Sequence, residues 1–206
     1  MPAALSSCAA VARSATWPSR YAAGMEPSST ADRADTRRAT VRPTPEQYFM
    51  LLAVATRERA ACLGRHVGAV LVSDQRIIAT GYNGTPTGFP NCDEGGCRRC
   101  AHPDDYSPGR GYDVCICVHA EQNAILQAAK LGYSAQGAHL YSTLRPCFGC
   151  LKEAYQAGVS RVRYLNDWRP SDPGEAQAYD ELLAEAARHG MTVEQLELPE
   201  MLLDLR

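Results

Sequence analysis

The sequence predicts an α/β fold in which a central sheet is covered by helices on both faces. Five short segments rich in β-branched residues recur along the chain, at 67–72, 76–81, 138–143, 161–165 and 191–196. Helical patterns separate the last three of these segments, and strands that alternate with helices are typical of a sheet covered on both sides. A chain of 206 residues suits one such domain, since single domains commonly span ~100–200 residues.

The first part of the chain differs in composition from the rest. Residues 1–43 are rich in Ala, Ser, Thr, Arg and Pro without helical or strand periodicity, so we expect a disordered tail there. This tail weakly resembles a transit peptide, and Met25 is an alternative start of the chain. We place the folded domain at 44–206.

The folded domain is expected to begin with a helix. Thr44 can cap the helix, Pro45 suits its first position, and Gln47 completes a capping box. We expect this helix to run to about Cys62. The next two strand segments flank Ser73-Asp74-Gln75, which predicts an antiparallel hairpin.

Residues 83–117 form a cysteine-rich insert. They contain many Gly, Pro, Asn, Asp and Cys residues and little periodic hydrophobicity, so a loop of this length needs something other than an apolar core to hold it. Regular structure is expected to resume after it. The later helices are predicted at 119–131, at 147–157 and within 173–189.

Composition limits the classes of function. The net charge of -2 provides no general basic surface for nucleic acid, and no apolar run approaches the ~20 residues of a membrane span. Nine cysteines, an odd number, occur without a convincing secretory signal, and two Cys-x-x-Cys pairs stand among them. This pattern favours metal binding in a reducing compartment, so we expect a cytoplasmic protein that does not bind membranes.

Three residues form the ligand set expected of a catalytic zinc site. Such a site uses three protein ligands, commonly Cys and His, and leaves a fourth position for water. Cys147 and Cys150 follow Pro146 at the predicted start of a helix, so both thiols lie on one face and the helix dipole favours their thiolate forms. His119 begins another predicted helix and supplies the third ligand.

Glu121 is the candidate catalytic base. Its position two residues after His119 would direct it away from that residue inside a regular helix, so we expect a base and not a ligand. Zinc with two thiolates and a neutral imidazole is formally neutral and acidifies water weakly, so a base is needed. We expect Glu121 to take a proton from the attacking water and to return protons until ammonia leaves an sp² carbon.

Each of these motifs has an ordinary structural explanation when it stands alone. Cys147 and Cys150 alone suit half of a zinc ribbon, and His119 with Glu121 alone suits a helix cap and a surface acid. Together, His-x-Glu and Pro-Cys-x-x-Cys are the known signature of zinc deaminases.

From Arg59 to Leu165 the chain resembles the deoxycytidylate (dCMP) deaminase family. The matching segments are VGAVLVSDQRIIATGYNGTPTG, NCDEGGCRRC, CICVHAEQNAI and LYSTLRPCFGC. HAE and PCxxC are shared by zinc nucleobase deaminases in general, whereas GYNGTPTG and the cysteine-rich segment are more particular to the dCMP branch. The resemblance implies a three-layer α/β/α cytidine deaminase-like fold with a central mixed five-stranded sheet.

The same resemblance implies an activity and partners. The implied reaction is hydrolysis of dCMP to dUMP and ammonia, which supplies dUMP for thymidylate synthesis. Many relatives are hexamers regulated by dCTP and dTTP, so the resemblance also implies a homo-oligomer with these nucleotides as regulators.

Substrate contacts are implied for two residues. Asn83 lies in the segment that covers the nucleotide in the family, although Asn83-Gly84 is also a common hairpin-turn signal. Arg59 matches the family's arginine at the end of the first helix, where it would meet the phosphate. The family often has Arg-Ser-Thr-Cys at this point, whereas this chain has Ala60 and Ala61, so one hydroxyl is absent.

A second, structural zinc is also implied. Relatives with such a site place ligands at positions that match Cys62, Cys92 and Cys117, and Cys100 is our choice for the fourth ligand, with Cys97 and Cys115 as close alternatives. A closed four-sulfur site would hold the insert in order.

Two other functions stay open from the sequence. One is deamination of a different cytosine nucleoside or nucleotide, or of another amino-heterocycle, including adenosine in tRNA; the last would need a basic face, which the sequence does not indicate. The other is a zinc scaffold that acts only as a binding module, against which the presence of Glu121 argues.

Overall fold

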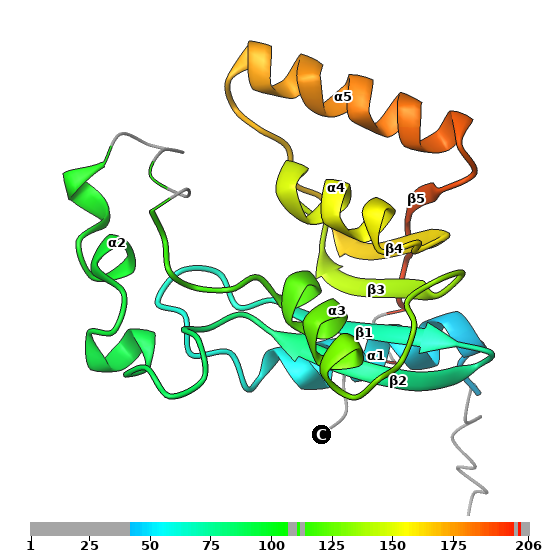
Figure 1. The fold of residues 1–206 in the computed structure, drawn as a ribbon, viewed down its shortest axis with the longest axis horizontal. Coiled ribbons are helices and arrows are strands. Elements are labelled where there is room, and N and C mark those ends of the chain that lie inside the picture. The colour runs from blue at the N-terminus through cyan, green and yellow to red at the C-terminus, as the bar shows by residue number, and fades with distance from the viewer. Residues whose placement is uncertain (1–41, 107–110, 112–113, 200–201, 203–206) are drawn as a thin grey trace, which may run out of the picture. The chain divides into compact units, whose positions relative to one another are not determined.

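A five-stranded mixed sheet with helices on both faces forms the centre of the protein (Figure 1). The computed structural model describes residues 42–106, 111, 114–199 and 202. The predicted fold class is confirmed. The predicted tail falls almost entirely outside the described residues, and the domain limits of 44–206, with the insert at 83–117, stay a prediction.

The sheet combines an antiparallel half with a parallel half. Its strands are β1 (Gly68–Ser73), β2 (Arg76–Tyr82), β3 (His139–Leu144), β4 (Arg161–Asn166) and β5 (Thr192–Gln195). They lie in the order β2-β1-β3-β4-β5, in which β1 is antiparallel to both β2 and β3, and β3, β4 and β5 are parallel. Each predicted strand is present, and the parallel half follows from the helices that connect its strands.

Side chains alternate across β1 and so separate two apolar cores. Ala69 and Leu71 pack in the core that includes the alanines of α3 (Ala120–Lys130), whereas Val70 and Val72 pack in a core with Phe49 and Met50 of α1 (Pro45–Arg57). The first core also takes residues from α4 (Phe148–Gln156) and α5 (Pro173–Arg188). The sheet is therefore the middle of three layers.

Two glycines allow the helices to approach the hairpin closely. A Cβ atom on Gly68 would lie 2.2 Å from the carbonyl oxygen of Ala53 in α1, and one on Gly81 would lie 2.1 Å from that of Ala120 in α3. Any larger residue at these positions would clash with helix backbone, and the backbone can give way only if the whole helix shifts. These contacts fix the first turn of α3 against β2.

Helix α1 begins as the sequence predicts and ends earlier. Thr44 and Gln47 form the capping box, with Thr44 N donating to Gln47 Oε1 at 2.9 Å and Gln47 N donating to Thr44 Oγ1 at 3.2 Å. The prediction that the helix reaches Cys62 is wrong, because α1 ends at Arg57. The amides of residues 58–60 bond to carbonyls three residues back, which tightens the last turn and turns the chain toward the other cysteines.

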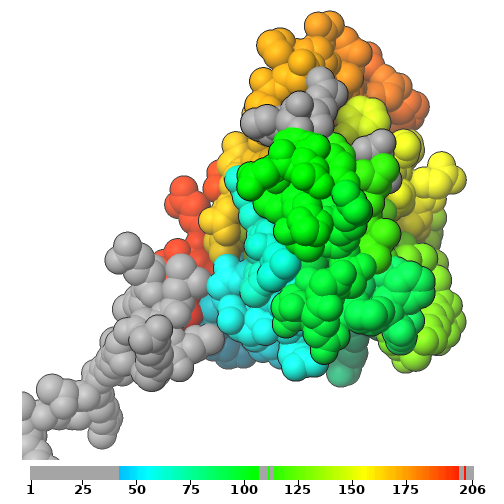
Figure 2. All heavy atoms as spheres, turned by 90° about the vertical axis from the view of Figure 1, so that its left-hand side faces the viewer, coloured from blue at the N-terminus to red at the C-terminus, as the bar shows by residue number. Residues whose placement is uncertain are grey.

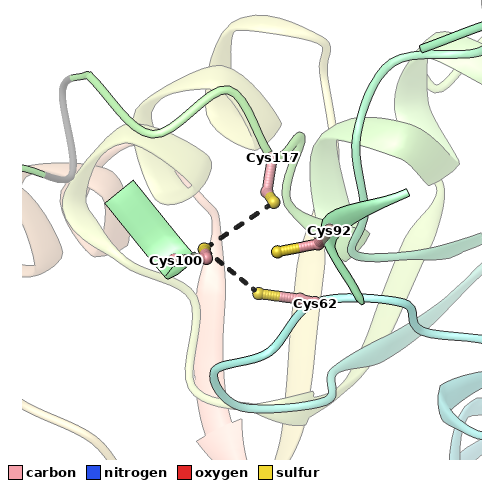
Figure 3. Close-up of side chains that lie close together, drawn as sticks. All are labelled: Cys62, Cys92, Cys100 and Cys117. Atoms are coloured by element: carbon pink, nitrogen blue, oxygen red, sulfur yellow. Dashed lines mark hydrogen bonds between the residues drawn. The ribbon is translucent and has the colours of Figure 1, made fainter. Parts of the chain in front are cut away.

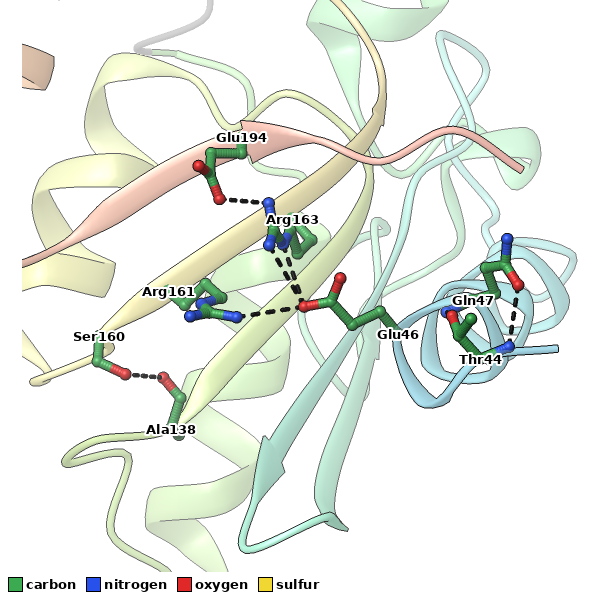
Figure 4. Close-up of polar contacts among 8 residues, drawn as sticks. All are labelled: Thr44, Glu46, Gln47, Ala138, Ser160, Arg161, Arg163 and Glu194. Carbon is green, nitrogen blue, oxygen red and sulfur yellow. Dashed lines mark hydrogen bonds and ion pairs between the residues drawn. The ribbon is translucent and has the colours of Figure 1, made fainter. Parts of the chain in front are cut away.

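An ion-pair network ties α1 to the parallel half of the sheet (Figure 4). Oε1 of Glu46 accepts from Arg161 Nη1 at 3.2 Å and from Arg163 Nη2 at 3.3 Å, and Arg163 also pairs with Glu194 of β5. Both arginines therefore have carboxylate partners on this face. They do not form a free basic surface there.

The β1–β2 hairpin turns through two residues in the left-handed region. Asp74 and Gln75 have φ of 49° and 61°, as a two-residue turn of the type that matches strand twist requires. The predicted hairpin is confirmed. Among the described residues, no helix combines the length and the apolar character needed to cross a membrane.

The described residues of the cysteine-rich insert include three short helical turns. They are η1 (Cys92–Glu94), α2 (Arg98–Ala101) and η2 (Pro103–Asp105). The insert lies beyond one end of the sheet, where its green spheres lie beside the cyan spheres of the residues that follow α1 (Figure 2). Among the described residues of the insert, the buried apolar side chains are cysteines, so a sulfur cluster occupies the place of an apolar core.

Candidate active site and metal centres

His119, Cys147 and Cys150 lie together at the N-termini of two helices. Nδ1 of His119 is 3.4 Å from Sγ of Cys147 and 3.3 Å from Sγ of Cys150. His119 is the N-cap of α3, and Cys147 is the N-cap of α4. The positive ends of both helix dipoles therefore meet at this site and favour negative charge there.

The backbone beside each donor is fixed by side chains from neighbouring elements. Oε1 of Gln122 accepts a hydrogen bond from His119 N at 2.9 Å, and its Nε2 donates to Glu153 of α4 at 3.1 Å. The hydroxyl of Tyr179, from α5, donates to the carbonyl of Pro146 at 2.7 Å. Contacts among α3, α4 and α5 thus hold the N-termini of α3 and α4, which carry the His and Cys side chains.

Glu121 is a buried carboxylate next to these donors. Its side chain is 4% exposed, and its Oε1 accepts a hydrogen bond of 2.9 Å from Ser142 Oγ of β3. Burial raises the pKa of Glu121 above its usual value, and the charge of Cys147 acts in the same direction. A carboxyl group with a raised pKa is suited to accept a proton and then return it.

The two thiols differ in their tendency to ionise. The hydrogen bond from Cys150 is the main cause that lowers the pKa of Cys147 to about 4, and the hydrogen bond with His119 adds to it. The same hydrogen bond with Cys147 raises the pKa of Cys150, as does burial. The hydrogen bond with Cys147 also raises the pKa of His119.

These three side chains fit a zinc ion. Their donor atoms all lie within 4.8 Å of one another. Zinc bonds of ~2.3 Å to sulfur and ~2.0 Å to nitrogen in a tetrahedron place the sulfur and nitrogen atoms ~3.5 Å apart, close to the separations found here. Three protein donors also leave a fourth position of the tetrahedron for water or substrate.

A comparison with protein families decides the classification. Residues 43–166, more than half of the chain, match the cytidine and deoxycytidylate deaminase zinc-binding region. The chain belongs to this deaminase family. It therefore contains a zinc-binding deaminase region, and the predicted family resemblance is confirmed.

Known deaminases of this family match this chain over different shares of their own length. The deoxycytidylate deaminase of Saccharomyces cerevisiae is 43% identical over 129 residues, which are 63% of this chain and 40% of that protein. The deoxycytidylate deaminase of Mycobacterium phage D29 is 40% identical over 128 residues, 60% of this chain and 95% of the phage protein. This chain thus matches only about two fifths of the length of the yeast relative.

A solved structure has the same fold. The dCMP deaminase of cyanophage S-TIM5, solved in complex with dCMP and dUMP, superposes with a TM-score of 0.56 at 30% sequence identity. The match covers 75% of this chain and 98% of the phage chain.

The four cysteines predicted to hold a second metal ion in this deaminase domain also lie together. Cys62, Cys92, Cys100 and Cys117 direct their sulfur atoms toward a common centre (Figure 3), all within 4.8 Å of one another. Sγ of Cys100 is 3.8 Å from that of Cys62 and 4.0 Å from that of Cys117. The structure thus brings the whole predicted set into one cluster, next to Cys97 and Cys115.

Asn83 is buried and bonded to the main chain. Its Oδ1 accepts from Val67 N at 2.8 Å, and its Nδ2 donates to the carbonyl of Arg65 at 2.7 Å. Gly84 pairs with Val118 in an isolated antiparallel bridge, so Asn83-Gly84 does not close a hairpin. Asn83 therefore fixes the loop that leads into β1.

A cavity of about 400 Å³ opens at the carboxyl ends of β3 and β4. Its walls include three basic residues, Arg57, Arg65 and His66, and one acidic residue, Asp167. Thr143 and Asn166, which end these strands, also line it, and Asn166 Nδ2 donates to the Thr143 carbonyl at 2.8 Å. Arg59 lies exposed beyond the end of α1 and is not one of the cavity's described lining residues.

Two residues of this region escaped the sequence analysis. Ser142 stands beside another hydroxyl residue, Thr143, in β3. The alternation of side chains between the two faces of the strand was the one sign that it points into the core. Arg65 lies between the predicted first helix and the strand that begins at residue 67. Its positive charge, close in sequence to Arg59, was the one feature that could have indicated a substrate contact.

Proposed function

We propose that this protein converts dCMP and water to dUMP and ammonia. The observation that carries the proposal is the buried Glu121 carboxylate beside the His119, Cys147 and Cys150 donors. Support for the substrate comes from relatives that are themselves named deoxycytidylate deaminases. Because the yeast relative is much longer than the matched region, the activity of the whole protein is part of this proposal.

The residues of the site divide the chemistry among them. His119, Cys147 and Cys150 would hold a zinc ion, which would act as a Lewis acid and make water a better nucleophile. Glu121 accepts the proton of that water, and it then returns protons to the substrate, so that the exocyclic amine leaves as ammonia. Ser142 keeps the Glu121 carboxylate in one orientation for both transfers.

The substrate's phosphate needs cationic partners. The basic wall of the cavity makes Arg65 and His66 candidates for this contact, beside Arg59, and ligands of open α/β sheets commonly bind at the carboxyl ends of strands. We propose that Asn83 contributes by holding the Arg65–Val67 loop, while the remaining N–H of its amide is available to the sugar.

Further proposals concern metal content, assembly and location. The four sulfurs of Cys62, Cys92, Cys100 and Cys117 would hold a structural zinc, which would stabilise the insert.

Exposed apolar side chains on α3 and α4, including Leu126 and Tyr155, support a homo-oligomer. The specific form that we propose is a hexamer regulated by dCTP and dTTP. The eight described cysteines are all free, which supports a reducing, cytoplasmic location.

One assay tests the reaction and its substrate. The purified protein is incubated with dCMP, CMP, deoxycytidine and cytidine, with and without dCTP, and the ultraviolet change on deamination is followed. We expect dCMP to have the highest kcat/KM. Equal rates with nucleosides and nucleotides would exclude the dCMP proposal, and light scattering of the same samples measures assembly.

A pair of glutamate variants tests the proposed base. Glu121→Gln should abolish turnover while the zinc content stays unchanged, because the amide cannot accept the proton. Glu181→Gln, on the exposed face of α5, is the matched control and should keep full activity. Loss of the catalytic zinc in Glu121→Gln would show that the residue is structural instead.

Arginine variants test the phosphate contact. A charge-assisted hydrogen bond contributes about 1.5–3 kcal/mol, so Arg65→Gln should raise KM for dCMP about 10-fold to 100-fold and leave deoxycytidine turnover unchanged. Arg59→Gln is measured in parallel. A larger effect from Arg59→Gln would place the phosphate at the end of α1 and outside the cavity.

A further inference from the structure

Six cysteines, and not four, form one continuous cluster beside the deaminase site. Cys62, Cys92, Cys100 and Cys117 all lie within 4.8 Å of one another, and so do Cys97, Cys100, Cys115 and Cys117. Each of these two quartets alone satisfies the ligand number of a closed zinc site. The quartets overlap, because Cys100 and Cys117 belong to both.

The overlap has the composition of a bridged pair of metal ions. Two tetrahedral ions need eight ligand positions, and six thiolates fill eight positions only when two of them bind both ions. The structure shares two cysteines between the quartets and leaves two for each quartet alone, namely Cys62 with Cys92 and Cys97 with Cys115. We propose that this cluster binds two zinc ions bridged by the thiolates of Cys100 and Cys117.

The separations between sulfur atoms agree with this arrangement. Zinc–sulfur bonds of ~2.3 Å in a tetrahedron place neighbouring sulfur atoms ~3.8 Å apart. Sγ of Cys100 lies 3.8 Å from Cys62, 3.7 Å from Cys115 and 4.0 Å from Cys117. Cys97 and Cys115 are 3.7 Å apart. Cys100 therefore has tetrahedral spacing to members of both quartets at once, as a bridging ligand must.

Main-chain N–H groups lie against the four thiols that belong to a single quartet, two in each quartet. Leu63 N donates to Sγ of Cys92 and Gly64 N donates to Sγ of Cys62, each at 3.4 Å. The N–H groups of Cys100 and Ile116 lie against the thiol of Cys97. The N–H of Cys117 lies against the thiol of Cys115.

This distribution suits terminal and bridging sulfurs. A terminal thiolate bonds to one metal ion and keeps more negative charge, which N–H donors stabilise, whereas a bridging thiolate shares its charge between two ions. Two Zn²⁺ ions with six thiolates have a total charge of about -2, the same as one Zn²⁺ with four thiolates. The second ion therefore neutralises Cys97 and Cys115 without adding to the charge of the buried cluster.

The number of metal ions tests this inference. Native mass spectrometry and elemental analysis of the full chain, produced with zinc, should give three zinc ions per chain, one at His119 and two in the cluster. Two ions per chain would overturn the bridged pair in favour of one structural zinc. Visible absorption from iron and sulfide would overturn the assignment to zinc.

Variants assign the ions to their ligands. The double variant Cys97→Ser/Cys115→Ser should lose one zinc ion, whereas a single zinc at Cys62, Cys92, Cys100 and Cys117 predicts no loss. In the cadmium-substituted wild-type protein, two ¹¹³Cd resonances coupled to each other through the shared sulfurs are expected, and uncoupled resonances would exclude bridging. The test does not depend on the proposed reaction, because Glu121→Gln should still bind all three zinc ions.

Discussion

The hydroxyl of Ser142 donates a hydrogen bond of 2.9 Å to Oε1 of Glu121, and both side chains are buried. The contact joins the middle of the sheet to the first turn of α3. It holds the carboxylate of Glu121 in place beside the His119, Cys147 and Cys150 donors. Ser142 is therefore a positioning residue for the proposed base.

Removing this hydroxyl should slow the reaction without removing zinc. A hydrogen bond to a charged group contributes about 1.5–3 kcal/mol, so Ser142→Ala should lower kcat about 10-fold to 100-fold. KM for dCMP should change little, because Ser142 orients the base and does not hold the nucleotide. Steady-state kinetics and zinc analysis measure both effects.

Ser160→Ala is the control for this prediction. Ser160 precedes β4, and its hydroxyl donates to the carbonyls of Gly137 and Ala138, which precede β3. Because this contact lies between two loops, its loss should leave kcat unchanged. A parallel rise of KM in Ser142→Ala would show that the residue acts on substrate binding instead.

The contact between Gly81 and α3 predicts a large loss of stability on substitution. In Gly81→Ala the new Cβ would lie 2.1 Å from Ala120 O and 2.4 Å from Ala124 N, so the strand or the helix must shift. Overpacking of this kind costs about 1–3 kcal/mol, and we expect the upper end because both atoms are backbone. Urea unfolding of the zinc-loaded protein measures the difference.

Gly84→Ala serves as the matched substitution. A Cβ on Gly84 meets no atom within 4 Å, so the free energy of unfolding should change by less than about 0.5 kcal/mol. Similar losses in both variants would show that the close approach at Gly81 is not the cause.

Tyr179 supports the cysteine ligands from a distance. Its ring is fully buried, and its hydroxyl donates to the carbonyl of Pro146, the residue before Cys147. Tyr179→Phe keeps the ring and leaves this carbonyl without its donor, which should lower the free energy of unfolding by about 1–2 kcal/mol. Tyr155→Phe, at a partly exposed position of α4, should change it by less than about 0.5 kcal/mol. Equal effects from the two variants would contradict a special role for the Pro146 contact.

Local patterns were sufficient to predict most of the fold. The capping box at Thr44 and the helix starts at His119 and Cys147 depend on neighbouring residues, so the sequence shows them directly. The end of α1 was predicted wrongly because it depends on contacts far along the chain. Residues 58–62 leave the helix where Gly68 meets its last turn and Cys62 joins the sulfur cluster.

The candidate site divides in the same way. His119, Glu121, Cys147 and Cys150 stand in two compact motifs, whereas Ser142 and Arg65 have no motif and become visible only when the sheet is assembled. Six cysteines at irregular spacings predict metal binding, but the two residues shared by both quartets follow only from the folded insert.

The turn between β1 and β2 gives a prediction of increased stability. Gln75 has a φ of 61°, a left-handed conformation that costs a non-glycine residue roughly 1–2 kcal/mol, and its side chain is exposed. Gln75→Gly removes this cost but adds freedom to the unfolded chain, which offsets about 0.4–1 kcal/mol. The free energy of unfolding should therefore rise by about 0.5–1 kcal/mol. Gln75→Ala keeps a Cβ and the same conformational cost, so it should give no gain in the free energy of unfolding. Urea unfolding measures both variants. An equal gain in the two would show that the stabilisation comes from loss of the glutamine side chain and not from relief of the backbone.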